Sequence, residues 1–164
     1  MTQMLDRLIK LYAIPDQSQY DSVLVANAIT IRRPRSYEKP QVLTWIREHF
    51  SNGWMGECDV TFGRQPITTF IATTGGELIG FCSYEATYRN FLGPVGVAES
   101  FRGRKVGSAL VLHCLHAMAE MGYAYAVVGG PKEAAPLYAK EFGAVDIAGS
   151  DVGIYVDRLN GRDS

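Results

Sequence analysis

The sequence predicts a mixed α/β domain in which helices cover both faces of one sheet. Short runs rich in β-branched residues alternate along the chain with stretches of apolar residues at helical spacing. The chain has 164 residues, the length of one domain, and its hydrophobic content of 47% is enough for one buried core. Glycine and proline clusters separate the alternating segments, as expected of turns.

The pattern at the start of the chain favours a short amphipathic helix. Its apolar residues recur at helical spacing before Pro15, where a helix would stop. We expect this segment to form an N-terminal helical extension over residues 1–27, added to a domain over residues 28–164. The apolar positions are Leu5, Leu8, Ile9 and Tyr12.

A strand and two helical segments follow. Residues 28–34 are rich in β-branched residues and end at a proline, which predicts the first strand. Residues 38–50 place apolar side chains on one helical face before an Asn-Gly pair, which predicts a helix. Residues 54–64 are ambiguous, and a broken helix is the prediction for them.

The middle of the chain predicts three strands. Residues 68–73 and 77–88 flank a Gly-Gly pair and read as a hairpin. Residues 90–98 form the fourth strand, which contains Gly93-Pro94 and Gly96. Such residues weaken an ordinary central strand and mark a bulge or the close approach of a ligand to the backbone.

The last third of the chain contains the clearest helix, over residues 107–121, whose apolar side chains form a continuous stripe. A buried strand is expected over residues 123–128 and a short helix over residues 133–142, ended by a glycine. Two short strands are expected within residues 144–159.

Charge and composition exclude several classes of protein. A formal net charge of −1 rules out the broad positive field that non-specific nucleic-acid binding needs. The three cysteines, Cys58, Cys82 and Cys114, lack the spacing of a metal site or a disulfide framework, which fits a reducing cytoplasm. No apolar run approaches the roughly 18 residues of a membrane span, so we expect neither a signal peptide nor an anchor, and no membrane partner.

A basic turn between the fourth strand and the long helix predicts an anion site. Arg102, Arg104 and Lys105 precede the helix, whose first N–H groups have no partner within the helix and carry partial positive charge. Three cations at that end of a helix oppose its dipole, and an anionic ligand would relieve the conflict. We therefore expect a phosphate-bearing small molecule here.

Two phosphate-binding motifs fail at this turn. A Walker loop needs Gly-Lys followed by Ser or Thr, whereas Gly107 is followed directly by Ser108. The dinucleotide fingerprint Gly-x-Gly-x-x-Gly occurs nowhere in the chain.

The remaining pattern resembles motif A of the GNAT superfamily, the acyl-CoA-dependent N-acetyltransferases. The turn Arg102-Gly-Arg-Lys-Val-Gly107 supplies the leading Arg and the final Gly of that motif, and it has Lys105 where a glycine is common. A register shifted by two, Arg104 to Ala109, also satisfies the pattern. The resemblance covers about half of the chain, from Phe70 to Ile147, and Gly-Pro-x-Gly-Val before the turn is similar to a bacterial subgroup of the family.

The resemblance implies a central, mostly antiparallel sheet with splayed strands four and five, and acetyl-CoA as co-substrate without a metal. The fourth strand would pair with pantetheine, and the turn would hold the diphosphate. Pro131 departs from the family, because many members carry an Asn there that contacts the coenzyme. The implied coenzyme-binding residues are Val95, Gly96, Val97, Arg102, Gly103, Arg104, Lys105, Val106, Gly107 and Ser108.

The resemblance also implies that Tyr138 is the general acid, since its ordinary pKa near 10 is close to that of an alkyl thiol. An amine with a pKa around 10 is neutral in about one molecule in a thousand at pH 7, so a base or a water chain must remove its proton. Glu85 and Glu57 are the candidates. Cys82 and Cys114 are interpreted as core residues, because the resemblance implies direct transfer without an acyl-enzyme.

We expect an N-acetyltransferase that transfers acetyl from acetyl-CoA to a primary amine, favouring a small molecule, by direct attack in a ternary complex. Trp54, Tyr84 and Tyr88 are candidates to line the acceptor pocket. The alternatives are a thioester hydrolase, a protein N-acetyltransferase and a non-catalytic acyl-CoA sensor. A homodimer through the terminal strands is common in such folds. His113 and His116 lie three apart on one helix without an evident third ligand, which argues against a metal site.

Overall fold

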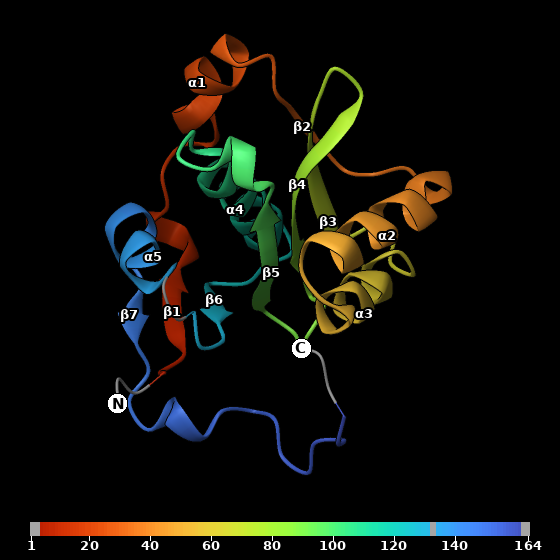
Figure 1. The fold of residues 1–164 in the computed structure, drawn as a ribbon. Helices are drawn as coiled ribbons and strands as arrows, with labels where there is room; N and C mark the ends of the chain where they lie inside the picture. Colours follow the sequence, from red (N-terminus) through yellow and green to blue (C-terminus); the bar gives the residue numbers. More distant parts are fainter. Residues whose placement is uncertain (1–3, 132–133, 162–164) are drawn as a thin grey trace.

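A computed structural model describes residues 4–131 and 134–161, and it contains one seven-stranded sheet in the order β2-β3-β4-β5-β6-β1-β7 (Figure 1). All neighbouring strands are antiparallel except β5 and β6, which pair in parallel. The mixed, mostly antiparallel sheet is confirmed. The strands are β1 (Arg7–Lys10), β2 (Thr30–Arg32), β3 (Thr69–Thr74), β4 (Glu77–Tyr84), β5 (Phe91–Val97), β6 (Tyr125–Val128) and β7 (Val145–Asp146).

Helices cover both faces of the sheet, as predicted (Figure 1). The pair α2–α3 packs its apolar residues against Ile71 and Phe81, and α4 packs on the opposite face against Ala72 and Cys82. Successive strand residues thus point to opposite faces of the sheet and pack in two separate apolar layers. The helices are α1 (Asp21–Ala26), α2 (Lys39–His49), α3 (Asn52–Thr61), α4 (Val106–Glu120) and α5 (Ala135–Phe142).

The prediction of a helix over Leu5 to Tyr12 is wrong, because this segment contains β1. Strand β1 lies between β6 and β7 and pairs antiparallel with both. Ile9 is fully buried while Lys10 is exposed, which is the alternation of a strand. The spacing of the four apolar residues suits a helix, but β6 and β7 offer backbone hydrogen bonds on both edges of the segment, and these decide in favour of the strand.

Two other expectations need correction. The helix expected to be broken over residues 54–64 is the continuous helix α3, whose N-cap Ser51 accepts a hydrogen bond from the Trp54 N–H. The tail forms only one of its two expected strands within the described residues. After β7 it continues as a 3₁₀ turn, Ser150–Val152, and then follows an irregular path to α3, where the Tyr155 hydroxyl donates to Glu57 over 2.9 Å.

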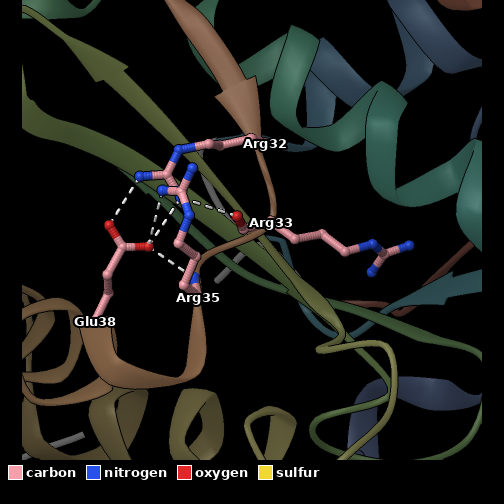
Figure 2. Close-up of polar contacts among 4 residues, drawn as sticks. All are labelled: Arg32, Arg33, Arg35 and Glu38. Carbon is pink, nitrogen blue, oxygen red and sulfur yellow. Dashed lines mark hydrogen bonds and ion pairs between the residues drawn. The ribbon is translucent and has the colours of Figure 1, made fainter.

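An ion pair ties the end of β2 to the start of α2 (Figure 2). The two terminal nitrogens of Arg32 donate to the two carboxylate oxygens of Glu38 over 2.9 and 2.8 Å, and the Arg35 N–H donates to Glu38 over 2.7 Å. The bidentate bond to Arg32 is the main reason why the pKa of Glu38 falls to about 2. The corner therefore fixes how α2 enters the face of the sheet.

Phe50 fills the space over β5 that the absence of a side chain at Gly96 leaves open. The ring lies in an aromatic cluster with Trp45, Trp54 and Phe81. A Cβ atom at Gly96 would overlap this ring. Since the neighbouring rings hold Phe50 in place, the glycine is needed for α2 and α3 to pack against β5.

Gly96→Ala is expected to lower the free energy of unfolding by about 1–3 kcal/mol, because the added methyl group overpacks the Phe50 cluster. Urea denaturation measures the change. Gly56→Ala on α3 is the matched control, because a methyl group there meets no atom within 4 Å and is expected to stabilise the helix slightly. An unchanged stability of Gly96→Ala would contradict the packing argument.

Candidate active site

Strand β5 has an open edge next to β6. Among residues 4–131 and 134–161, the two strands pair only at Phe91 and Leu92, and β6 ends at Val128. The Ala98 N–H donates to the Ile79 carbonyl on β4 over 2.8 Å. Because bonded and non-bonded pairs alternate along an antiparallel ladder, Val95 and Val97 turn their peptide groups away from β4 and toward the open edge. These groups can pair with an extended ligand. The splay expected between the predicted fourth and fifth strands, residues 90–98 and 123–128, is thus present between β5 and β6.

The turn after β5 delivers the chain into α4 through two left-handed residues. Gly103 and Lys105 have φ values of 80° and 64°. The first intrahelical bond runs from the Ala109 N–H to the Lys105 carbonyl over 2.9 Å. In the described part of the chain, the N–H groups of Val106, Gly107 and Ser108 have no backbone acceptor, which makes this end of α4 attractive to an anion.

The three cations of the turn lie in different environments. The Arg102 Nε donates to the Val97 carbonyl over 3.2 Å. The Arg104 guanidinium lies 5.2 Å from the centre of the Phe101 ring. The Lys105 ammonium binds the carboxylate of Glu141 on α5. Arg102 thus links the turn to the open edge of β5, while Lys105 joins it to α5.

Glu141 places a carboxylate beside the start of α4, which the sequence reasoning missed. It accepts hydrogen bonds from Lys105 and, over 2.8 Å, from the Tyr20 hydroxyl. Burial acts to raise the pKa of Glu141, but hydrogen bonds from Lys105, Ser108 and Tyr20 outweigh it and lower that pKa. Glu141 lies three residues after Tyr138, one helical turn along α5, and this spacing was the signal available in the sequence.

Tyr138 lies in the core rather than at the surface, with 3% of the residue exposed. Burial raises the pKa of its hydroxyl, and the nearby thiols of Cys82 and Cys114 add to the effect. Burial also raises the pKa of Cys82, and the Cys114 thiol donates to the Cys82 carbonyl over 3.4 Å. The phenol therefore keeps its proton at neutral pH among uncharged neighbours.

The two candidate carboxylates have partners of their own. Glu85 is buried at the end of β4, and it accepts from the Asn90 N–H over 2.6 Å and from the Tyr123 hydroxyl over 3.1 Å. Glu57 lies on α3 and accepts from Tyr155. These contacts stabilise the turn after β4 and the tail, and the role of either residue as a base stays a prediction.

Of the three aromatic residues expected around an acceptor, two line clefts and Trp54 does not. Tyr84 and Tyr88 line two neighbouring clefts of about 560 and 330 Å³. Trp54 lines neither cleft and instead packs against Phe50 and Phe81. Its position on α3 turns it toward the sheet, and its role in an acceptor pocket stays a prediction.

The two histidines of α4 contact backbone carbonyls. His113 Nδ1 lies 2.9 Å from the Ala109 carbonyl oxygen, and His116 Nε2 lies 2.9 Å from that of Pro15. Across residues 4–131 and 134–161, no group of three or more His, Cys, Asp or Glu side chains is arranged to hold a metal ion. No helix in these ranges is both long and apolar enough to cross a membrane.

Glu141→Gln is expected to lower the thermal stability of the ligand-free protein at pH 7, because Lys105 and the start of α4 lose a negative neighbour. The pKa of Glu141 lies below its ordinary value of 4.5, so its ionised form stabilises the fold above that pH. This stabilisation disappears as the pH falls through the lowered pKa. The variant should therefore lose less stability than the wild type between pH 7 and about pH 3.

Glu48→Gln is the control for this pH profile. Glu48 is exposed on α2 and forms no ion pair in the described residues. Its replacement should leave the profile parallel to that of the wild type. A Glu141→Gln profile that is also parallel would show that Glu141 adds no pH-dependent stability.

Comparison with known proteins identifies the family. Residues 33–144, more than half of the chain, match the family model described as Acetyltransferase (GNAT) family. The matched range contains β5, the basic turn, α4 and Tyr138. Among curated proteins, no significant match is found.

Solved structures with the same fold are distant in sequence. The glucosamine N-acetyltransferase region of a fungal multidomain β-N-acetylglucosaminidase has a TM-score of 0.71 at 15% identity, covering 87% of this chain and 19% of that one. A GCN5-related N-acetyltransferase from Sphaerobacter thermophilus has a TM-score of 0.63 at 19% identity, covering 87% of this chain and 48% of that one.

An aminoglycoside acetyltransferase from an uncultured soil metagenomic sample has a TM-score of 0.53 at 16% identity, covering 71% of this chain and 89% of that one. The chain spans between 19% and 48% of the length of the first solved structures that it matches. The fold, the splayed sheet and the family model agree. The chain belongs to the GNAT family of acetyltransferases.

Proposed function

We propose that this protein transfers the acetyl group of acetyl-CoA to a primary amine of a small molecule by direct attack in a ternary complex. One observation carries the proposal. The peptide groups of Val95 and Val97, apart from the Val97 carbonyl that Arg102 binds, are open on the strand that leads into α4. At the start of α4, three N–H groups have no backbone acceptor among the described residues. An extended chain that ends in a diphosphate matches both features at once.

The coenzyme supplies an activated thioester, and the chain supplies its binding contacts. Val95 and Val97 would hold the pantetheine arm by strand-like hydrogen bonds. The N–H groups of Val106, Gly107 and Ser108 would face the diphosphate, with Arg104 and Lys105 adding positive charge. Arg102 would keep the turn in place through its bond to the Val97 carbonyl. Pro131 stands at the position where many family members carry an Asn. Gly103 contributes its left-handed backbone, and Gly96 contributes the space that Phe50 fills.

Tyr138 would donate its proton to the departing thiolate. The C–S bond of the thioester breaks as the amine nitrogen bonds to the carbonyl carbon, and the phenol proton goes to the sulfur. A raised phenol pKa ensures that this proton is present at neutral pH. The same uncharged surroundings would raise the pKa of a thiol formed beside Tyr138, so donor and acceptor stay matched.

Glu85 is the better candidate to remove the amine proton. It lies in the wall of the cleft of about 330 Å³, whereas Glu57 is engaged with the tail on α3. The Tyr123 hydroxyl and the Asn90 N–H hold the carboxylate in one orientation. Amino sugars are the first acceptors to test, since two proteins of the same fold are named for acetyl transfer to glucosamine and to aminoglycosides.

Acetyl-CoA is expected to bind with micromolar affinity in isothermal titration, and acetyl-pantetheine, which lacks the diphosphate, more than about tenfold more weakly. Glu141→Gln should bind acetyl-CoA several-fold more tightly than the wild type, because it removes the negative charge beside the diphosphate site. Glu48→Gln should bind like the wild type. No heat at a few hundred micromolar acetyl-CoA would reject the proposed function.

Tyr138→Phe is expected to reduce kcat by about 100-fold or more without changing the affinity for acetyl-CoA, because only the donated proton is lost. Release of free thiol is followed over a panel of amino sugars, other small amines and peptides. Tyr37→Phe, at an exposed position in the 3₁₀ turn before α2, is the control and should keep full activity.

Three results would contradict this assignment. Full activity of Tyr138→Phe at every pH would remove Tyr138 from the mechanism. Tight binding of acetyl-CoA without thiol release for any acceptor would favour a sensor, and release with peptides alone would favour a protein N-acetyltransferase.

A further inference from the structure

The larger cleft lies at the end of α4 opposite the basic turn. It has a volume of about 560 Å³, within the range of sites for small molecules. A helix of 15 residues is roughly 22 Å long, so this cleft is well separated from the unpaired N–H groups of α4. Its lining includes Arg33 just after β2, Arg64 and Thr68 from the segment between α3 and β3, Tyr84 at the end of β4 and Glu120 at the end of α4.

Arg33 reaches this cleft because it points away from the ion pair at the β2–α2 corner. Figure 2 shows the side chains of Arg32 and Arg35 directed toward Glu38, and that of Arg33 directed to the other side of the strand. Its Nη1 donates to the Tyr84 hydroxyl over 2.8 Å and to the Ile67 carbonyl over 2.5 Å. The guanidinium also lies 4.5 Å from the centre of the Phe70 ring. Arg33 is therefore held in one position before any ligand arrives.

The two arginines of the cleft have no ion-pair partner among the described residues. Arg64 donates through Nη2 to the Glu85 carbonyl over 2.9 Å. Within the described residues, neither Arg33 nor Arg64 has a carboxylate within 4 Å, although Glu120 lines the same cleft. Nor is any acceptor found there for Nε and Nη2 of Arg33. Two fixed guanidinium groups with free N–H donors suit an oxyanion.

Thr68 adds a second, independent observation. It lies in the wall of the cleft with 4% of the residue exposed, and its Oγ1 has no hydrogen-bond partner among the described residues. A buried hydroxyl without a partner costs about 1–3 kcal/mol. The Tyr84 hydroxyl accepts a bond from Arg33, which leaves its own proton to donate. Among the described residues, both hydroxyls in the wall of this cleft therefore have hydrogen-bonding capacity that the protein does not use.

We propose that this cleft binds a small molecule that carries a carboxylate or phosphate group, held by Arg33, Arg64, Thr68 and Tyr84. Arg64 also lines the smaller cleft beside Glu85, so a bound molecule can extend from one cleft into the other. Binding of the oxyanion can be measured without acetyl transfer, and only its role as the acceptor rests on the proposed function. The ligand is either the acceptor itself, anchored by its anionic group, or a separate effector.

The test uses the full chain without coenzyme. Inorganic phosphate and succinate are titrated while the Arg side-chain Nε–H signals are followed by NMR, with succinamide as the uncharged control. Both anions should shift the Arg33 and Arg64 signals saturably, and succinamide should not. Arg64→Gln is expected to weaken the binding by about tenfold or more, whereas Arg47→Gln, an exposed arginine on α2, leaves it unchanged.

Thr68→Val separates a ligand role from a structural one. If Oγ1 serves a ligand, the variant binds succinate more weakly although it is at least as stable as the wild type, since an unpartnered buried hydroxyl has been removed. Arg33→Lys keeps the charge and loses the planar fork, so it should also bind more weakly. Equal binding by the wild type, Arg64→Gln and Thr68→Val would overturn the proposal.

Incubation with acetyl-CoA shows whether the anionic ligand is the acetyl acceptor or a separate effector. Amines that carry a carboxylate or phosphate are compared with neutral analogues by mass spectrometry. A lower KM for the anionic amine, lost in Arg64→Gln, identifies the ligand as the acceptor. Saturable anion binding without such a preference identifies an effector. Failure of acetyl-CoA to bind would reject the proposed function but leave the anion titration intact.

Discussion

The divergence of β5 from β6 is the constraint on which the rest of the structure depends. Parallel pairing stops after Leu92, so five residues of β5 run on with one edge unpaired. An unpaired edge inside a domain normally costs hydrogen bonds. Here the edge leads into the basic turn, and Arg102 binds one of its carbonyls. The open edge and the start of α4 are therefore parts of one site.

The opposite face of β5 shows how this opening is stabilised. Phe50 covers Gly96 and is itself held by Trp45, Trp54 and Phe81, so β5 is fixed from the α2–α3 side. On the other side, Val95 and Val97 pack against the main core. The strand does not need β6 to keep its position, which leaves its edge free to pair with another extended chain.

The N-terminal segment contributes to both the sheet and the site. Strand β1 fills the position between β6 and β7, beside the divergence. The segment then continues through a 3₁₀ turn, Gln17–Tyr20, which brings the Tyr20 hydroxyl to Glu141 on α5, beside the start of α4. Burial and this contact raise the pKa of Tyr20 to about 12, so the phenol donates to the carboxylate at neutral pH. The boundary predicted at residue 28 thus separates two parts that share a sheet.

The sequence alone determined the elements whose signals are local. The apolar stripe of α4, the hairpin of β3 and β4, and the basic turn each depend on residues close together in the chain. Tertiary structure decided the rest, because the other features depend on contacts between residues that are far apart in the sequence. The period of Leu5 to Tyr12 suits a helix, but two neighbouring strands make it β1. Glu141 meets Lys105, and Arg33 shares a cleft with Arg64, only after the sheet and α4 bring separate segments together.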